Sequence, residues 1–115
     1  MKTIQLLAPA ALAASLILSL PAALAADAAK GKTAYEKNGC WQCHGLVGQG
    51  GIAGPKLAPD PKPMAFYTAF VRKSGGAMPP YSETILAPAD LADIHAYLQS
   101  IRKGADYKSI PLLNN

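Results

Sequence analysis

The chain has 115 residues, of which 11 are basic and 7 acidic, for a formal net charge of +4. This length fits one domain and excludes a Rossmann or barrel enzyme, the two cysteines exclude a multi-disulfide scaffold, and the charge is too small to indicate nucleic-acid binding. With 10 glycines, 10 prolines and 7% aromatic residues, we expect a thin core that needs a further component to stabilise it.

Residues 1–25 have the features of a secretory signal peptide. Lys2 provides the positive start, no charged residue follows until Asp27, and Ala23-Leu24-Ala25 is a small-x-small cleavage site. The alternative is a retained membrane anchor, because the uncharged run is nearly long enough to span a bilayer. Since Pro9 and Pro21 shorten its apolar centre, we predict cleavage after Ala25, a single domain over residues 26–115 and no stable membrane anchor.

The first predicted helix runs from Asp27 to Asn38. Asp27 is a favourable N-cap, and Asn38-Gly39 is a favourable C-terminal stop. A glycine in mid-helix costs about 1 kcal/mol relative to alanine, so we expect Gly31 to mark a close approach to another helix. The predicted inward stripe consists of Ala28, Gly31, Tyr35 and Asn38.

The segment Cys40-Trp41-Gln42-Cys43-His44 carries the clearest chemical signal. Cysteines at positions i and i+3 lie about one helical turn apart, so two thiols reach the two vinyl groups of one haem. The histidine after the second cysteine then lies beneath the ring, within reach of the iron. C-x-x-C-H is for this reason an attachment signal for c-type haem, and we predict one covalent haem c with its iron on Cys40 and Cys43.

Three other interpretations of these residues are open. A redox disulfide of thioredoxin type needs a βαβ setting, which the sequence does not show. A structural zinc site needs four ligands, and Cys40, Cys43, His44 and the remote His95 form a poor set. A plain disulfide across two residues closes a loop too small to stabilise much. All three are weaker than the haem interpretation.

Residues 45–63 are rich in glycine and proline, so they form neither helix nor strand and must wrap something else. A haem supplies both the missing core and the object to be wrapped. The second predicted helix follows over residues 63–74 and ends at Gly75-Gly76. Its predicted inward residues are Met64, Tyr67, Phe70 and Val71.

The third predicted helix begins at Pro88, which suits the first helical position, and its last turn contains Arg102 and Lys103 before the stop at Gly104. No segment alternates long enough to be a strand, and residues 105–115 form a tail. The predicted apolar face of this helix consists of Leu91, Ile94, Leu98 and Ile101.

From about Ala29 to Ile101, the chain resembles the small monohaem class I cytochromes c of bacterial periplasms. The resemblance implies an all-α fold in which three to four helices surround one covalent haem. It also implies that the first and last helices cross, with Gly31 and Tyr35 against Ile94 and Tyr97. The matching segments are Lys30-Gly31-Lys32 with Tyr35, Gly54-Pro55-Lys56-Leu57, Ala77-Met78-Pro79 and Ile94-His95-Ala96-Tyr97-Leu98.

His44 is the first axial ligand by its place in the haem motif, and the resemblance gives the carbonyl of Pro55 as the acceptor that orients its ring. The sixth ligand has three candidates. Met78 is favoured, because it lies between flexible Gly75-Gly76 and rigid Pro79-Pro80 and because Met/His ligation is usual in cytochromes c. Met64 fits core packing on its helix better, and His95 fits the edge of an apolar stripe.

Met78 follows His44 by only 34 positions, so segments that cover the haem propionates in larger relatives are reduced here. Arg72 is the first candidate for a propionate contact, with Tyr67, Tyr81 and Lys56 as others. A basic docking edge around the haem is expected from Lys56, Lys62, Arg72 and Lys73.

Two axial ligands leave no open iron position, which favours one-electron transfer over substrate chemistry. The resemblance therefore implies a periplasmic electron carrier, or the cytochrome subunit of a periplasmic dehydrogenase such as a flavoenzyme oxidising aromatic alcohols or phenols. A terminal oxidase or another cytochrome is a further expected partner, and the protein itself is not expected to be an enzyme. The alternative is a haem-based gas sensor or peroxide-reacting protein in which Met78 is displaced.

Overall fold

The computed structural model describes residues 25–114, so all of the predicted signal peptide except Ala25 lies outside the described residues. Over this range the chain is helical and contains no strand, as predicted. None of its described helices is long and apolar enough to cross a membrane. The helices, in chain order, are α1 (Ala28–Lys37), α2 (Cys40–His44), α3 (Met64–Lys73), α4 (Pro88–Ser100) and the short 3-10 helices η1 (Tyr107–Ser109) and η2 (Pro111–Leu113).

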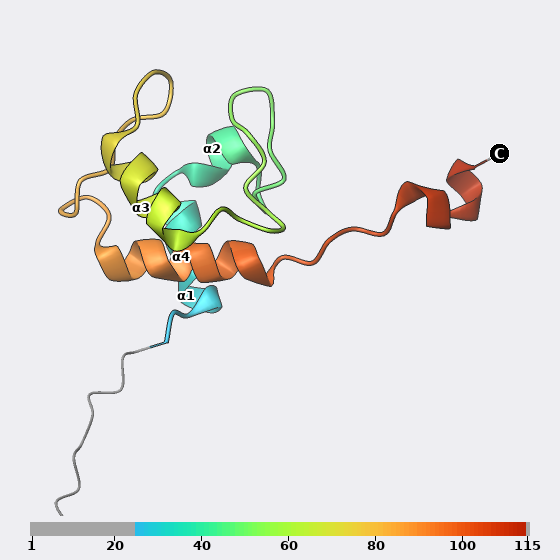
Figure 1. The fold of residues 1–115 in the computed structure, drawn as a ribbon, viewed down its shortest axis with the longest axis horizontal. Helices are drawn as coiled ribbons and strands as arrows, with labels where there is room; N and C mark the ends of the chain where they lie inside the picture. Colours follow the sequence, from blue (N-terminus) through green and yellow to red (C-terminus); the bar gives the residue numbers. More distant parts are fainter. Residues whose placement is uncertain (1–24, 115) are drawn as a thin grey trace, which may run out of the picture.

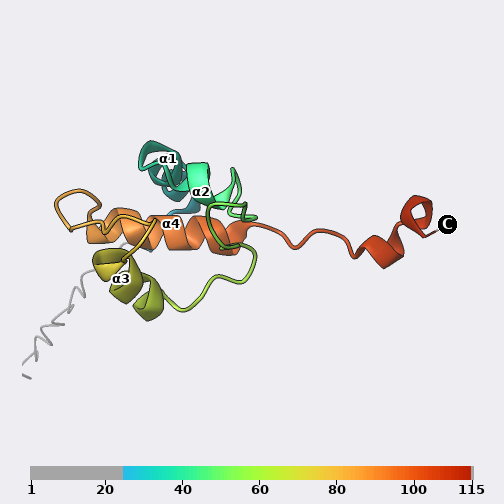
Figure 2. The same cartoon turned by 90° about the horizontal axis from the view of Figure 1, so that it is seen from above.

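Helix α4 is the centre of the fold (Figure 1). Figure 2 shows α1 and α2 on one side of α4 and α3 on the other. The loops that connect α2, α3 and α4 complete the body of the domain. In both views the chain beyond α4 runs away from the helices and ends in η1 and η2. The tail therefore adds nothing to the core.

Helix α1 starts where the sequence predicts. The Asp27 carboxylate accepts hydrogen bonds from the backbone nitrogens of Ala29 and Lys30, and these bonds hold the pKa of Asp27 below its ordinary value. The backbone nitrogen of Asp27 in turn donates to Asp93 of α4 at 2.7 Å. Asp27 thus caps the start of α1 and also fastens this helix to α4.

The crossing of α1 and α4 is as close as the resemblance implies. Gly31 lies against the backbone of Asp93 and Ile94, where a Cβ atom would have no room. The rings of Tyr35 and Tyr97 pack in a tilted arrangement with centroids 5.6 Å apart. The buried residues of α1 are Gly31, Ala34 and Tyr35, so the inward stripe includes Ala34, whereas Ala28 and Asn38 are only partly buried.

One prediction about the helices needs refinement and another is wrong in detail. Phe70 was expected inward with Tyr67 and Val71; it is not in the buried core but lines the cavity described below, where it is 48% exposed and stacks on Phe66. Helix α4 ends at Ser100 rather than at Lys103. The helix ends because the backbone becomes extended at Ile101, with φ −69° and ψ 122°; the Ser100 hydroxyl donates to the Tyr97 carbonyl at 2.6 Å in this last turn.

Candidate haem-binding site

A cavity of about 440 Å³ lies between α2, α3 and α4 and the loops around residues 53–57 and 77–81. This volume is within the range of small-molecule and cofactor sites, about 300–1,000 Å³. Its walls are mostly apolar, and Tyr35, Leu91 and Leu98 of the buried core line it. Cys40, Cys43 and His44 line it from α2. The residues of the haem motif therefore share one cavity.

Helix α2 is a single short helix enclosed by two glycines in left-handed or related conformations. Gly39 has φ 72° before it, and Gly45 has φ 82° after it. These positive φ values, which side chains other than glycine adopt at a cost, turn the chain sharply at both ends. Cys40 is half-buried and Cys43 exposed, and neither forms a disulfide. The short helix holds the two thiols on the cavity wall.

The geometry argues against the other interpretations of the cysteines. Burial raises the pKa of the Cys40 thiol to about 11, so it is protonated at neutral pH and lacks the thiolate that thioredoxin-type chemistry needs. Within residues 25–114, no three metal-binding side chains gather in a zinc-like cluster. His95 lies apart from the cavity lining. The thiols are better suited to attachment of a cofactor than to redox exchange or zinc.

His44 is buried, and its ring is held in one orientation. Its Nδ1 lies 2.8 Å from the carbonyl oxygen of Pro55. Because a carbonyl only accepts hydrogen bonds, Nδ1 donates, which leaves the lone pair of Nε2 free for a metal. Sequence reasoning had not identified Gly54 as part of this support. A Cβ at Gly54 would lie 2.9 Å from both His44 Nδ1 and the Cys43 carbonyl oxygen, so only glycine fits there; its place beside Pro55 was the signal.

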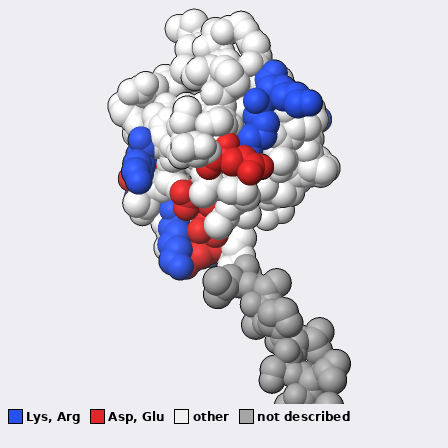
Figure 3. All heavy atoms as spheres, turned by 90° about the vertical axis from the view of Figure 1, so that its left-hand side faces the viewer, with Lys and Arg blue, Asp and Glu red and all other residues white. Residues whose placement is uncertain are grey.

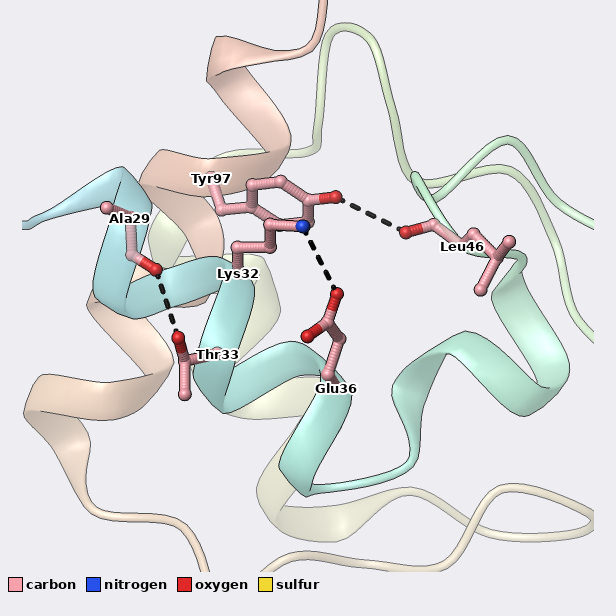
Figure 4. A network of polar contacts seen from close by, with 6 residues as sticks. All are labelled: Ala29, Lys32, Thr33, Glu36, Leu46 and Tyr97. Atoms are coloured by element: carbon pink, nitrogen blue, oxygen red, sulfur yellow. Dashed lines mark hydrogen bonds and ion pairs between the residues drawn. The ribbon is translucent and has the colours of Figure 1, made fainter.

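The glycine- and proline-rich loop folds back onto α2 through its backbone. Gly50 donates to the His44 carbonyl at 2.8 Å. Two core tyrosines reach the same region. Tyr35 Oη donates to the Gly45 carbonyl at 2.7 Å. Tyr97 Oη donates to the Leu46 carbonyl at 3.3 Å, as Figure 4 shows. The α1–α4 pair thus fixes the chain directly after His44. The Lys32–Glu36 ion pair in the same view is exposed and adds little to stability.

The three candidates for a second iron ligand differ in whether they line the cavity. Met78 lines it and is partly buried. Met64 is not part of the lining and packs against the hydrophobic core. His95 is buried rather than at a boundary, and its Nε2 donates to the Lys62 carbonyl at 2.8 Å while its ring meets the edge of Tyr67. Of the three, Met78 alone shares the cavity with His44.

Among the candidates for contact with propionates, Tyr67, Tyr81 and Lys56 line the cavity and Arg72 does not. Arg72 instead donates through Nη1 to three backbone carbonyls that follow the Met78 loop, which we define as residues 75–80. The structure therefore does not bring Arg72 together with the other candidate haem contacts.

Only some of the residues expected to form a basic docking edge lie around the cavity. Lys56 and Lys62 line the cavity, whereas Lys73 is exposed at the end of α3. On the face shown in Figure 3, acidic and basic side chains lie next to one another. This face therefore carries no patch of a single sign.

The residues present fit a haem c. Tyr67 Oη is buried in the cavity wall without a hydrogen-bond partner, and burial raises the pKa of Tyr67 to about 12. A buried hydroxyl of this kind costs free energy unless an acceptor is supplied, and a bound group with polar edges supplies one. The remaining requirements are two thiols one turn apart, an oriented imidazole and an apolar cavity, and all are met.

Comparison with known proteins gives one family. No curated protein and no solved structure matches the chain significantly. The model of the family described as cytochrome C oxidase, cbb3-type, subunit III matches residues 26–98, which is more than half of the chain. Its members are c-type cytochrome domains, with a covalent haem c and its iron as cofactor, and Cys40, Cys43 and His44 fit their haem motif. The chain therefore belongs to this family and is a small monohaem cytochrome c.

Proposed function

We propose that the protein is a periplasmic one-electron carrier whose haem iron is bound by His44 and Met78. Haem c supplies a one-electron redox centre, and Met/His ligation gives it a raised potential. The observation that carries the proposal is the cavity, which His44 and Met78 both line while Met64 and His95 do not. His44 and Met78 would together hold the iron, so the bound haem would supply one-electron transfer and offer no iron site to a substrate.

The roles of the chain's own residues follow from their contacts. Cys40 and Cys43 hold the cofactor covalently from α2. Pro55 fixes the ring of His44 through the 2.8 Å hydrogen bond to Nδ1, which sets the tautomer and raises the basicity of Nε2. The apolar lining excludes water from this region and so limits the reorganisation that accompanies a change of charge.

For the partner, we propose a periplasmic dehydrogenase as electron donor, with a terminal oxidase or another cytochrome as acceptor. The resemblance to cytochrome subunits of flavoenzymes that oxidise aromatic alcohols or phenols supports this donor. The predicted signal peptide of residues 1–25 supports the location. The matched family is described as part of an oxidase, which supports an oxidase as acceptor.

A haem-based gas sensor or peroxide-reacting protein is the alternative function. A peroxide-reacting protein needs an acid or base beside the iron, and His95 is the only histidine besides His44. Its ring is engaged by the Lys62 carbonyl and by Tyr67, outside the cavity lining. This arrangement favours the electron carrier.

The test compares two methionine variants of the holoprotein. Met78→Ala should abolish the weak far-red absorption of thioether-bound ferric haem, lower the potential and allow carbon monoxide to bind. Met64→Ala is the matched control and should do none of these. Rapid carbon monoxide binding by the unmodified protein would instead support the sensor. Intact mass of the denatured protein should show one haem still attached, which acid acetone does not remove.

A further inference from the structure

The Met78 loop is not held in place by its own backbone. Within the described residues, none of the loop's backbone groups pairs with another backbone group. A Cβ atom at Gly75 or Gly76 would meet nothing within 4 Å, so open space surrounds the start of the loop. Besides the packing of its own side chain against the core, the position of Met78 therefore depends on contacts at the two ends of the loop.

At the first end, the hydroxyl of Ser74 donates to the carbonyl of Pro79 at 2.9 Å. Ser74 is buried although it is polar, and its hydroxyl closes the loop into a ring that contains Met78. This hydrogen bond joins two residues of the same short segment. It gives the loop its shape but does not by itself fasten both ends to the rest of the domain.

At the second end, the chain is fastened to helix α3. The backbone nitrogen of Tyr81 donates to the Val71 carbonyl at 2.9 Å. Arg72 Nη1 donates to the carbonyls of Tyr81, Ser82 and Leu86 at 2.9, 3.2 and 2.7 Å. The Tyr81 hydroxyl also donates to the Asn38 carbonyl at 3.0 Å, which ties this end to the chain just before the haem motif.

The guanidinium of Arg72 is held against this turn by its hydrogen bonds. Hydrogen bonds from a guanidinium are charge-assisted and stronger than those between neutral groups, and the guanidinium keeps its charge at all working pH values. The guanidinium adopts the orientation in which Nη1 donates to the three carbonyls. In this orientation the buried Nε has no hydrogen-bond partner.

We propose that Arg72 is a positioning residue for Met78. By holding residues 81–86 against the end of α3, it fixes where the Met78 loop presents its thioether to the cavity. The proposal rests on the proposed role of Met78 as iron ligand. It gives Arg72 a role in place of the propionate contact expected from the resemblance.

The experiment uses the holoprotein with Arg72→Met and, as matched control, Lys73→Met. Lys73 is the next residue on the same helix and is exposed, so the control removes the same charge without the three hydrogen bonds. The first measurement is hydrogen–deuterium exchange at the backbone amides of Tyr81, Ile85 and Leu86, which are the hydrogen-bonded amides of residues 75–86. The second is the rate at which imidazole displaces the methionine from ferric haem.

Arg72→Met should increase both rates about tenfold or more, as expected for loss of charge-assisted bonds, and Lys73→Met should leave them within about twofold of the unmodified protein. Ser74→Ala removes the hydrogen bond to the Pro79 carbonyl and should also increase both rates. If Arg72→Met does not fold, Arg72→Lys keeps an aliphatic stem and one charged donor group and should give intermediate rates. Rates in the Arg72 variants equal to those of Lys73→Met would overturn the proposal, as would a changed potential with unchanged exchange, which a propionate contact predicts.

Failure of the proposed iron ligand has a different signature. If Met78→Ala leaves the far-red band and the potential unchanged, Met78 is not the ligand, and the assignment of Arg72 as its positioning residue falls with it. Hydrogen exchange at Tyr81, Ile85 and Leu86 still shows in that case whether Arg72 holds this segment against α3. The two results together separate an error about the ligand from an error about Arg72.

Discussion

Replacing Gly31 by alanine tests the helix crossing on which the fold depends. A Cβ at this position would overlap the backbone carbonyl group of Asp93 and lie 2.9 Å from the nitrogen of Ile94, inside the 3.0 Å that real Cβ contacts essentially never cross. Both neighbours are backbone atoms of α4, so no side chain can rotate away. Helices α1 and α4 must move apart, and the packing of Tyr35 on Tyr97 is loosened with them.

Overpacking of this kind costs about 1–3 kcal/mol, and the upper end applies because the obstacle is a helix backbone. Alanine regains up to about 1 kcal/mol of helix propensity, which leaves a net loss of about 2 kcal/mol. For a domain of this size that corresponds to a fall in Tm of about 10 °C. Thermal unfolding of the holoprotein followed by circular dichroism measures it.

The control is Gly104→Ala, where the added Cβ meets nothing within 4 Å, and whose effect should stay within about 0.5 kcal/mol. A Gly31→Ala protein as stable as this control would refute the close crossing as the reason for the glycine.

Three further predictions concern the surroundings of the cavity. Gly54→Ala should displace the ring of His44 and reduce the yield of haem-loaded protein about tenfold, measured by the haem absorbance of purified material. His95→Ala should lower the free energy of unfolding by about 2 kcal/mol in a denaturant titration, because the hydrogen bond to Lys62 and the contact with Tyr67 are lost; an altered haem spectrum would contradict this role. Because burial raises the pKa of Tyr67 from 10.0 to about 12, its neutral form stabilises the fold below pH 10, and this stability should be lost as the pH rises from about 10 to about 12. Tyr67→Phe should reduce this loss without abolishing it, because burial also raises the pKa values of Tyr35 and Tyr81.

Much of the site was predictable because its signals are local. The haem motif is contained in five consecutive residues, and Asp27 marks the start of α1 by its own side-chain chemistry. The place of Met78 follows from the glycines before it and the prolines after it. The carbonyl of Pro55 was expected from the family resemblance, and its hydrogen bond to His44 is present. Such features depend on neighbours in the sequence.

The remaining features depend on distant contacts. The spacing of Phe70 fits an inward face, but the choice between core and cavity wall is made by the packing of α3 on the rest of the domain. The direction of the Arg72 side chain depends on a turn 9 to 14 residues further along. The end of α4 was misplaced because Arg102 and Gly104 are typical of a last turn, whereas the backbone already becomes extended at Ile101, which packs against the core.

Because α1 packs on α4, the first and the last α-helix of the domain hold its structure together. A contact between residues as far apart as Asp27 and Asp93 carries a large loop-closure entropy and forms only when nearly the whole domain has been synthesised. A chain truncated within α4 loses the partner of Gly31 and Tyr35 together, and with it the fastening of the chain beside His44. A chain truncated after Ile101 keeps both, because the tail lies away from the core. Tolerance to C-terminal deletion should therefore change abruptly at the end of α4 rather than decline gradually along the chain.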